Sequence, residues 1–508
     1  MVEGLTTILD IGLGLTGLFI AYKLANRPTP MPLPPGPRKW PIIGNLLDVP
    51  TEKEWLTFAK WGDLVSISIF GRRMIIVGSS EVAIELLEKR GASYSDRPTL
   101  QMGGEMIGWK NILSMLPYGE RHKTYRRLFY QSIGNNASMS KFYPIEEDET
   151  HKFLKQLLSS PDGLSKHIRR TAGAIILHIS HGYEVQGSND PFIEVADIAL
   201  EQFSLSTAPA KFLVNLIPSL SLVPDWFPGT RFKTIAREWA KKLEEMIEGP
   251  HQYVKDQMSS GSATSSFTSN LLKEPDITPE KEFEIKWSAG SLYAGGADTT
   301  VSSIYAFFKA MSLYPEVVAE AQAEIDSVVG TDRLPSFADR EYLPYVNAIV
   351  SEVMRWNAVV PIPPHVAQED DIYGGYSIPK GTLIIPNIWQ MQHDPRVYSD
   401  PMTFNPKRFL GPNPEPAPRK ICFGFGRRIC PGRVLADASI FISCAMTLAV
   451  FDISKFIDES GQVIEPIMDQ TTGTVRYDSS ATAFNTVFDK ALIQVTQRLS
   501  GVRSSQGL

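Results

Sequence analysis

Hydrophobic and polar positions alternate as in a strand over one short region and follow a helical period through much of the remaining chain. The runs Val65–Phe70 and Met74–Val77 lie on either side of a glycine and two arginines, which predicts a β-hairpin. Residues 118–325 are mostly helical in pattern. Gly374–Gly375 and Lys380–Gly381 separate further short strands. The pattern predicts an α+β fold class, mainly α with a small β region.

The longest predicted helix begins at Thr278-Pro279-Glu280, where an N-cap, a proline and an acid of the first turn coincide. It is expected to reach Tyr314, just before Pro315, as a central and largely buried strut. A second helix is predicted over Pro344–Trp356. A third, which is apolar and expected to be buried, is predicted over Val434–Phe451.

The chain begins with an apolar run, Leu5–Tyr22, which is long enough to span a bilayer. An acid precedes the run and basic residues follow it, which favours a cytosolic location for the bulk of the chain. A buried amphipathic helix is the alternative interpretation. Seven prolines in residues 28–41 predict a stiff, extended hinge. The expected organisation is an N-terminal membrane anchor (1–27), a proline-rich hinge (28–50) and one large domain (51–508).

Composition narrows the partners and the compartment. A net charge of −6 over 508 residues gives no reason to expect a nucleic-acid partner. The three cysteines, Cys422, Cys430 and Cys444, cannot build a disulfide framework and match no zinc spacing. A reducing compartment is therefore expected.

The segment from Phe423 to Gly432 has the features of a thiolate-ligand loop. Cys430 precedes Pro431, which suits a helix's first turn, so its sulfur would lie where free N–H groups and the helix dipole favour an anion. Gly426 and Gly432 permit tight turns and close approach of a flat cofactor. Phe423 can cover one face of the sulfur, and Arg428 can pair with a cofactor carboxylate. The alternative, a buried structural cysteine, fits Cys422 and Cys444.

The complete pattern Phe-x-x-Gly-x-Arg-x-Cys-x-Gly in residues 423–432 resembles the haem-binding loop of the cytochrome P-450 superfamily. The resemblance extends along the chain and is closest to fungal microsomal members of secondary metabolism. It implies the cytochrome P-450 fold with an N-terminal transmembrane helix. It also implies that Cys430 is the axial ligand of the iron in haem b (iron protoporphyrin IX).

The long helix contains a second motif, Ala294-Gly295-Gly296-Ala297-Asp298-Thr299. Two adjacent glycines within a helix cost roughly 1 kcal/mol each, which suggests close approach to the backbone. Oxygen activation at a thiolate-bound iron needs protons, which the Thr299 hydroxyl can donate and Asp298 can pass inward. By the resemblance the helix opens locally over the haem. The alternative is tight helix packing at Gly295 and Gly296 with a solvated Asp298.

The resemblance implies two supporting sets of residues. Glu352 and Arg355, one helical turn apart, would form with Arg408 a buried charge network that holds the cysteine loop. The haem propionates would pair with a set of cationic or hydrogen-bonding side chains: Arg97, His122, Arg126, His365 and Arg428. The family usually has tryptophan where this chain has His122, so the role of that residue is less defined.

The function implied is a monooxygenase that uses O2 and NADPH electrons from cytochrome P-450 reductase, with cytochrome b5 as a second partner to consider. It would hydroxylate or epoxidise an apolar small molecule, for example a terpenoid, from a single-pass position in the endoplasmic reticulum membrane. Two alternatives remain: a rearrangement or dehydration on the same fold, and a non-enzymatic membrane haem sensor. A basic face for the reductase is predicted from Lys123, Arg419, Lys420, Arg427 and Arg433.

The family's substrate regions map onto five segments: Leu100–Trp109, Phe203–Pro228, Ser291–Tyr293, Val359–Pro363 and roughly Val475–Thr482. Their apolar residues suit an apolar ligand. Within the second segment, Leu216–Phe227 either dips into the bilayer or packs on the core.

Overall fold

The computed structural model describes residues 16–17, 31–187, 189–208, 211–458, 460–466 and 493–498, which fall into two compact units. The first comprises the chain up to Pro98 with Ile362–Gln390 and Phe425–Arg427; the second comprises Thr99–Pro361, Met391–Gly424 and the chain from Arg428 onward. The predicted anchor and the substrate region Val475–Thr482 lie outside the described residues, apart from Thr16 and Gly17, which are helical.

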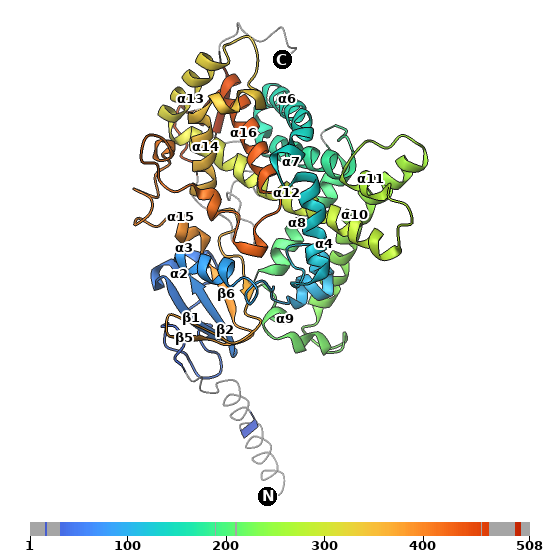
Figure 1. Ribbon diagram of the computed structural model, residues 1–508, viewed down its shortest axis with the longest axis vertical. Helices are drawn as coiled ribbons and strands as arrows, with labels where there is room; N and C mark the ends of the chain where they lie inside the picture. The colour runs from blue at the N-terminus through green and yellow to red at the C-terminus, as the bar shows by residue number, and fades with distance from the viewer. Residues whose placement is uncertain are drawn as a thin grey trace, which may run out of the picture. The chain divides into compact units, whose positions relative to one another are not determined.

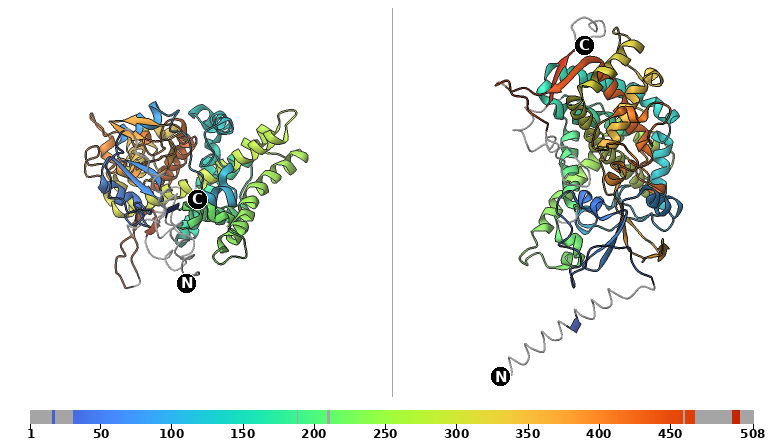
Figure 2. Two further views of the ribbon diagram at one scale, coloured as in Figure 1. Left: turned by 90° about the horizontal axis from the view of Figure 1, so that it is seen from below. Right: turned by 90° about the vertical axis from the view of Figure 1, so that its left-hand side faces the viewer.

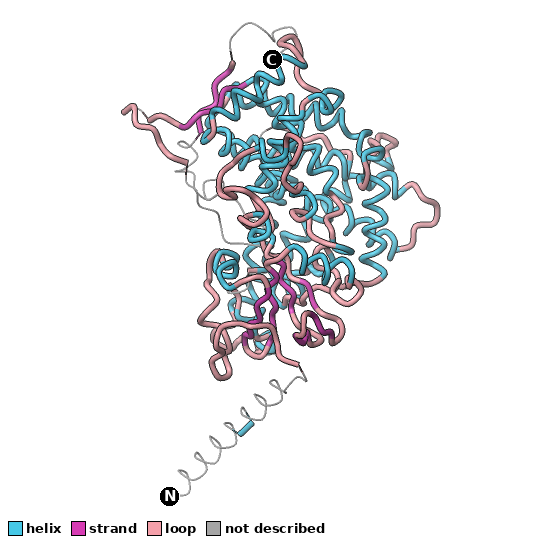
Figure 3. The backbone as a smooth tube through the Cα atoms, turned by 60° about the vertical axis from the view of Figure 1, so that its left-hand side comes forward, coloured by secondary structure: helices cyan, strands magenta, loops and turns pink. Residues whose placement is uncertain are grey.

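The first unit is built around a four-stranded sheet of order β1-β2-β6-β3, seen as adjacent strands in Figure 3. Its elements are α2 (Glu54–Trp61), β1 (Leu64–Ile69), β2 (Arg72–Val77), α3 (Ser80–Ile84), the π-helix η1 (Glu85–Lys89), β3 (His365–Val366), β4 (Asp371–Tyr373), β5 (Tyr376–Ile378) and β6 (Leu383–Pro386). The predicted hairpin is confirmed: β1 and β2 pair antiparallel, and both turn residues, Phe70 (φ 47°) and Gly71 (φ 81°), are left-handed, as a two-residue hairpin turn requires.

The described part of the proline-rich hinge packs on this unit. The backbone N–H of Ser66 in β1 donates to the carbonyl of Pro35 (2.8 Å), and the Ser66 hydroxyl donates to that of Pro34 (2.5 Å). The carbonyl of Pro32 accepts from the N–H of Ser377 at 2.8 Å. These bonds satisfy carbonyls that an extended proline segment cannot pair internally. Residues 32–35 are therefore bound to strands of the first unit.

The second unit is mainly helical, and Figures 1 and 2 show its helices from three sides. Its α-helices are α4 (Glu120–Ile133), α5 (Asn136–Met139), α6 (Tyr143–Ser159), α7 (Leu164–His181), α8 (Pro191–Thr207), α9 (Leu213–Leu216), α10 (Arg231–Ser259), α11 (Phe267–Leu272), α12 (Pro279–Leu313), α13 (Pro315–Val328), α14 (Pro344–Trp356) and α16 (Arg433–Val450), and α15 (Ile388–Gln392) crosses the boundary between the units. Shorter elements are the π-helix η2 (Gln101–Ile107), the 3-10 helices η3 (Trp109–Asn111), η4 (Ser140–Phe142), η5 (Pro161–Gly163), η6 (Pro218–Leu222), η7 (Phe337–Tyr342), η8 (Pro406–Phe409) and η9 (Pro418–Lys420), and the paired strands β7 (Phe451–Lys455) and β8 (Ile493–Gln497). The 3-10 helix η10 (Gly426–Arg428) also crosses that boundary.

Helix α12 is the predicted central strut. The Thr278 hydroxyl accepts from the N–H of Lys281 (3.2 Å), as an N-cap should, and the helix ends at Leu313. It packs against α7, α4, α14 and α16 (Figure 1). The predicted local opening is not found, because α12 is α-helical throughout. The Thr299 hydroxyl donates to the Gly295 carbonyl at 2.7 Å, an i to i−4 bond that an intact helix accommodates.

Helix α16 follows the cysteine loop and lies one residue from the predicted position. Its length and composition would allow it to cross a membrane, but 78% of it is buried inside the protein. It is a core helix, as its predicted apolar character indicated. Helix α14 has the predicted bounds.

A buried carboxyl group joins α6 to α16. Glu146 is fully buried, and its Oε1 accepts a hydrogen bond from the Ser439 hydroxyl at 2.6 Å. Its Oε2 has no hydrogen-bond partner among the described residues. Burial raises the pKa of Glu146 to about 8, from an ordinary value of 4.5. The side chain is therefore a neutral acid at pH 7.

This raised pKa predicts a pH-dependent stability difference for Glu146→Gln. Between pH 4.5 and about 8 the unfolded chain releases this proton while the folded chain keeps it, so the wild-type free energy of unfolding falls as pH rises. Glutamine does not ionise, so the free energy of unfolding of the variant lacks this fall with rising pH. We expect the variant to gain about 3 kcal/mol over wild type between pH 5 and 7.5, measured by denaturant unfolding. Asp148→Asn, at an exposed site on α6, is the control. A Glu146→Gln difference that is the same at both pH values would contradict the assigned pKa.

Candidate active site

Cys430 lies in a tight loop ahead of α16. Its backbone N–H donates to the carbonyl of Phe423 at 2.8 Å, and the N–H of Gly424 donates to the carbonyl of Ile421 at 2.9 Å. Helix α16 begins at Arg433 with Gly432 as its N-cap. Pro431 therefore precedes the helix, whereas the sequence pattern predicted it in the first turn. The backbone N–H of Gly432 still bonds to the Cys430 sulfur, so a free helix-terminal donor meets the thiol as expected.

Two cations surround this thiol. Burial raises the pKa of the Cys430 thiol, and the Gly432 N–H and the charges of Arg126 and Arg433 oppose that rise. Arg126, on α4, is held by a hydrogen bond to the Ile429 carbonyl (2.7 Å), and burial lowers its pKa. Burial also raises the pKa of the Cys422 thiol, which has one neighbouring cation, and that of Cys444. Cys430 thus has the environment best suited to a thiolate ligand.

The glycines of the loop have different roles. Gly426 has a left-handed φ of 53°, and a Cβ there would collide with the carbonyl of Leu87. The absence of a side chain therefore permits a left-handed turn, as predicted, and also close packing against the Leu87 backbone. A Cβ on Gly432 would lie 3.9 Å from the Cys430 sulfur, an ordinary contact. Phe423 packs against the core of the second unit.

The two adjacent glycines of α12, Gly295 and Gly296, have different roles. A Cβ on Gly296 would lie 2.5 Å from the Cδ1 of Ile176 on α7, so helix packing requires this glycine. A Cβ on Gly295 would meet nothing within 4 Å, and this residue is exposed in an otherwise buried part of the helix. The Thr299 hydroxyl donates to the Gly295 carbonyl at 2.7 Å. Gly295 and Thr299 therefore share an accessible face, whereas Gly296 fits the packing alternative.

Asp298 is buried rather than solvated, and it forms an ion pair. Its Oδ1 lies 3.3 Å from a guanidinium nitrogen of Arg169 on α7, and the same nitrogen lies 3.6 Å from Oδ1 of Asp197 on α8. Burial raises the pKa of Asp197 to about 6, against the opposing charge of Arg169. Asp298 is thus held toward α7. Sequence reasoning did not find Arg169 or Asp197, because their pairing joins three helices distant in sequence.

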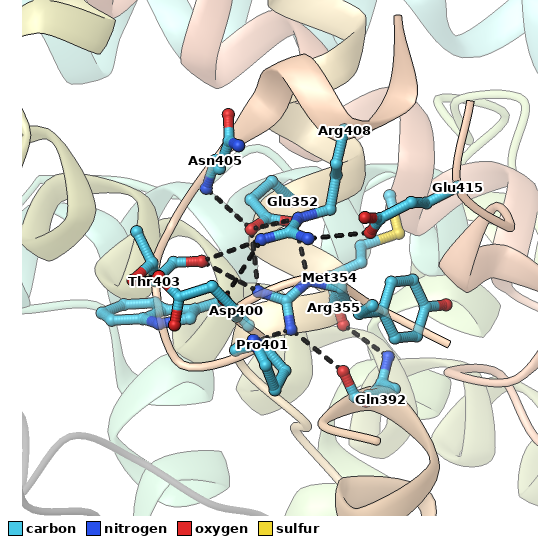
Figure 4. A network of polar contacts seen from close by, with 12 residues as sticks. Glu352, Met354, Arg355, Gln392, Asp400, Pro401, Thr403, Asn405, Arg408 and Glu415 are labelled. Atoms are coloured by element: carbon cyan, nitrogen blue, oxygen red, sulfur yellow. Dashed lines mark hydrogen bonds and ion pairs between the residues drawn. The ribbon is translucent and has the colours of Figure 1, made fainter. Parts of the chain in front are cut away.

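The predicted charge network is present (Figure 4). Arg355 donates to both carboxylate oxygens of Glu352, at 2.7 and 2.8 Å, and Nε of Arg408 lies 3.1 Å from Oε1 of Glu352. The side chains of Glu352 and Arg355 are completely buried. The network also contains a residue that the sequence did not reveal, Glu415, whose Oε2 accepts from Arg408 at 2.7 Å.

The contacts of this network reach the segment ahead of the cysteine loop. Arg355 donates to the carbonyls of Gln392 (2.9 Å) and Pro401 (2.7 Å), and Arg408 donates to that of Ser399 (2.7 Å). The expected hold on the cysteine loop is therefore indirect.

A second network lies at the segment just ahead of the cysteine loop. Nε of Arg419 donates to Asp437 of α16 at 2.7 Å, and its NH1 donates to the Ser351 hydroxyl of α14 at 2.6 Å. Arg340 also pairs with Asp437. Arg419, predicted as part of a basic docking face, instead connects η9, just ahead of the cysteine loop, to two core helices.

The predicted propionate partners divide between the two units. In the second unit, His122 is buried on α4, and Arg428 donates to the Leu116 carbonyl at 2.7 Å. In the first, Arg97 donates to the Pro364 carbonyl, and Nδ1 of His365 bonds to the Tyr94 carbonyl at 2.9 Å. Nε of Arg97 is buried without a hydrogen-bond partner among the described residues, and burial lowers the pKa of Arg97 to about 10. A desolvated cation of this kind is suited to a carboxylate. Within the second unit, His122, Arg428, the thiol environment of Cys430 and the open position at Gly295 fit a haem.

Comparisons with known proteins agree with this geometry. The sequence model of the cytochrome P450 family matches residues 34–476. Cytochrome P450 monooxygenase 208 of Postia placenta is 50% identical over 469 residues, covering 91% of each chain. Cytochrome P450 monooxygenase claR of Ampulloclitocybe clavipes is 44% identical over 480 residues, covering 93% of this chain and 89% of the relative. Cytochrome P450 monooxygenase CLM2 of Gibberella zeae is 42% identical over 455 residues, covering 87% and 86%.

Proposed function

Because the chain belongs to the cytochrome P450 family, we propose that it is a membrane-bound haem-thiolate monooxygenase that hydroxylates or epoxidises an apolar small molecule. The observation that carries the proposal is the Cys430 loop, in which a thiol, a donated N–H and two guanidinium groups meet. The proposed cofactor is haem b, with electrons from NADPH through cytochrome P-450 reductase and with cytochrome b5 as a second candidate donor.

The residues described above would hold this cofactor. Cys430 supplies the sulfur ligand, and the propionates are assigned to the set predicted from the sequence: Arg97, His122, Arg126, His365 and Arg428. When bound, a haem-thiolate centre supplies the activation of O2. The protein contributes the ligand, its electrostatic environment and the shaped surroundings.

Proton supply is assigned to α12. The Thr299 hydroxyl, on the accessible face beside Gly295, holds a proton that its bond to the Gly295 carbonyl orients. Asp298 is held by Arg169, which also reaches Asp197. With a pKa of about 6, Asp197 exchanges protons near neutral pH, so this set of side chains is suited to resupply Thr299.

This proton supply favours oxygenation over rearrangement, which needs no external proton delivery, and over a sensor, which needs no catalytic relay. The test uses the purified full chain with a cytochrome P-450 reductase and NADPH. An oxygenase should consume O2 and NADPH faster when a ligand of the apolar class is added, and should form an oxygenated product. Turnover without O2 would favour the rearrangement, and the absence of any turnover would favour the sensor.

The reductase is proposed to dock on exposed basic residues near Cys430. Lys420 and Arg433 are both exposed, whereas Arg419 is committed to Asp437 and Lys123 pairs with Glu120 at 2.7 Å. A basic surface attracts an acidic partner and accelerates association at low salt. We expect the double reversal Lys420→Glu with Arg433→Glu to slow reduction about tenfold at low ionic strength, and less at high ionic strength.

Stopped-flow reduction by the reductase measures this effect. Lys273→Glu, an exposed lysine at the end of α11, changes the net charge without touching the proposed surface and should leave the rate unchanged. If Lys273→Glu slows reduction as much as the double variant does, or if the double variant does not slow it, this docking surface is refuted.

The proposed location of the protein in the cell and its proposed substrate class rest on the sequence and on the family. We propose a single N-terminal membrane span in the endoplasmic reticulum with the catalytic part in the cytosol. The most exposed apolar side chains of the segment Leu216–Phe227 are Leu222 (82%) and Trp226 (81%), which supports contact with a lipid surface rather than packing on the core. A role in fungal secondary metabolism, with a terpenoid as one candidate substrate, remains part of this proposal.

A further inference from the structure

A single buried amide connects two segments of the second unit. Asn215, on α9, is 3% exposed. Its Oδ1 accepts the backbone N–H of Met102 in η2 at 2.8 Å, and its Nδ2 donates to the carbonyl of Ser206 in α8 at 2.8 Å. One side chain on α9 therefore bonds to two other elements, η2 and α8.

Both bonds pair groups that helix geometry leaves without a partner. Met102 is the second residue of η2, where N–H groups have no acceptor within the helix. Ser206 belongs to the last turn of α8, where carbonyls have no donor within the helix. Met102 and Ser206 are each 0% exposed, so water does not replace Asn215 in this arrangement. Loss of the amide would leave a buried donor and a buried acceptor unpaired.

The surrounding contacts require η2 to lie close to α8. A Cβ on Gly103 would lie 2.9 Å from the hydroxyl oxygen of Ser206 and 3.1 Å from a methyl carbon of Thr207. The rings of Trp109 and Phe203 lie 4.8 Å apart. Seven-residue π-helices such as η2 are uncommon and are often found at functional positions. The Asn215 bridge thus fixes an unusual element against the end of a helix.

The far end of the same segment is attached to α12 near the proposed reaction site. The N–H of Leu113 donates to the Ser291 hydroxyl at 2.9 Å. Ser291 lies one helical turn before Gly295, whose face with Thr299 is accessible. The segment from Met102 to Leu113 therefore extends from Asn215 to the accessible part of α12.

We propose that Asn215 is a positioning residue that keeps η2 docked on α8, and that its two hydrogen bonds limit how fast a bulky apolar molecule reaches the face of α12 at Gly295 and Thr299. Asn215 touches no reacting atom. The inference rests on the proposed function, because it assumes that ligands must reach a haem beside this face. The inference predicts that the Asn215 amide affects how fast ligands reach the haem and does not affect the chemical step.

The experiment compares two azoles of different size that bind haem iron, clotrimazole and imidazole, on the full-length haem protein. Asn215→Ala should accelerate association of clotrimazole about tenfold, because opening no longer breaks two buried hydrogen bonds. Association of imidazole should change less than about twofold, since a small ligand needs little opening. Stopped-flow absorbance measures both rates. Equal changes for the two azoles, or no change for clotrimazole, would overturn the proposal.

A second readout does not depend on haem. Amide hydrogen exchange in peptides covering residues 100–108 and 200–208 should increase at least about tenfold in Asn215→Ala, with α13 unchanged. Faster exchange throughout the second unit would show general destabilisation and would overturn the positioning role. Asn136→Ala, at an exposed position on α5, is the matched control and should leave both readouts unchanged.

A second variant reaches the same interface without altering Asn215. Gly103→Ala places a methyl group against Ser206 and Thr207 and should weaken docking of η2, with the same selective acceleration for clotrimazole. If the wild-type protein binds no azole at all, the proposed haem function fails. If it binds both azoles and neither variant discriminates between them, the Asn215 proposal alone fails.

Discussion

Replacing Cys430 by alanine is expected to abolish NADPH-driven oxygenation while leaving the fold intact. The side chain is small and only partly buried, and the loop is held by backbone bonds such as that from the Cys430 N–H to Phe423, which alanine preserves. What is lost is the sulfur that we propose as the ligand of the haem iron. Product formation should fall by on the order of a hundredfold or more, measured as product formed per haem with reductase and NADPH.

Cys422→Ala is the matched control for this variant. Cys422 belongs to the same loop, and burial keeps its thiol protonated by raising its pKa. Its removal should cost some packing and leave oxygenation within about threefold of wild type. Equal losses of oxygenation in both variants would show that this region tolerates no substitution. Full activity in Cys430→Ala would contradict the assignment of Cys430 as the haem ligand.

Glu352→Gln is expected to have the largest effect on stability. The carboxylate accepts from Arg355 and Arg408 and from the Asn405 N–H (2.8 Å), in a region where Arg355 has no solvent exposure. A neutral amide leaves the Arg355 guanidinium buried without its counter-charge. The free energy of unfolding should fall by about 3–5 kcal/mol, measured by denaturant unfolding of the full chain. Haem retention should fall with it, because Arg355 and Arg408 position the backbone ahead of the cysteine loop.

Glu320→Gln is the control for this prediction, because it removes the same charge from an exposed site on a neighbouring element. Glu320 pairs with Lys407 at 2.8 Å, but both side chains are well exposed. Glu320→Gln should cost less than about 1 kcal/mol. Comparable losses in the two variants would mean that the Glu352 network contributes no more than a surface ion pair.

Sequence reasoning was most successful where the signal was local. The hairpin at Gly71, the Thr278 cap, the bounds of α14 and the pairing of Glu352 with Arg355 each depend on residues a few positions apart. Periodicity and capping report such short-range constraints directly.

The interactions that sequence reasoning missed join distant segments. The pairs of Asp298 with Arg169 and of Arg419 with Asp437 involve polar residues that look like ordinary surface positions in a sequence. The burial of Glu146 was equally invisible, because it belongs to a run of four acidic residues, 146–149. Only the packed helices show that these groups are removed from water.

The adjacent glycines of α12 show how a correct motif can contain two physical causes. Both fitted one explanation in the sequence, yet Gly296 is required by Ile176 of α7, and Gly295 belongs to the accessible face with Thr299. The predicted opening of the helix was wrong for a related reason: the Thr299 hydroxyl bonds to the Gly295 carbonyl within an unbroken helix. A motif identifies positions, whereas their roles depend on what packs against each one.

The absorption spectrum of the reduced, carbon monoxide-bound full-length protein tests most directly whether this chain ligates haem through a thiolate. Sulfur ligation by Cys430 predicts a strongly red-shifted Soret band that disappears in Cys430→Ala and persists in Cys422→Ala. A Soret band at the unshifted position typical of histidine-ligated haem, or a red-shifted band that survives the loss of Cys430, would contradict it.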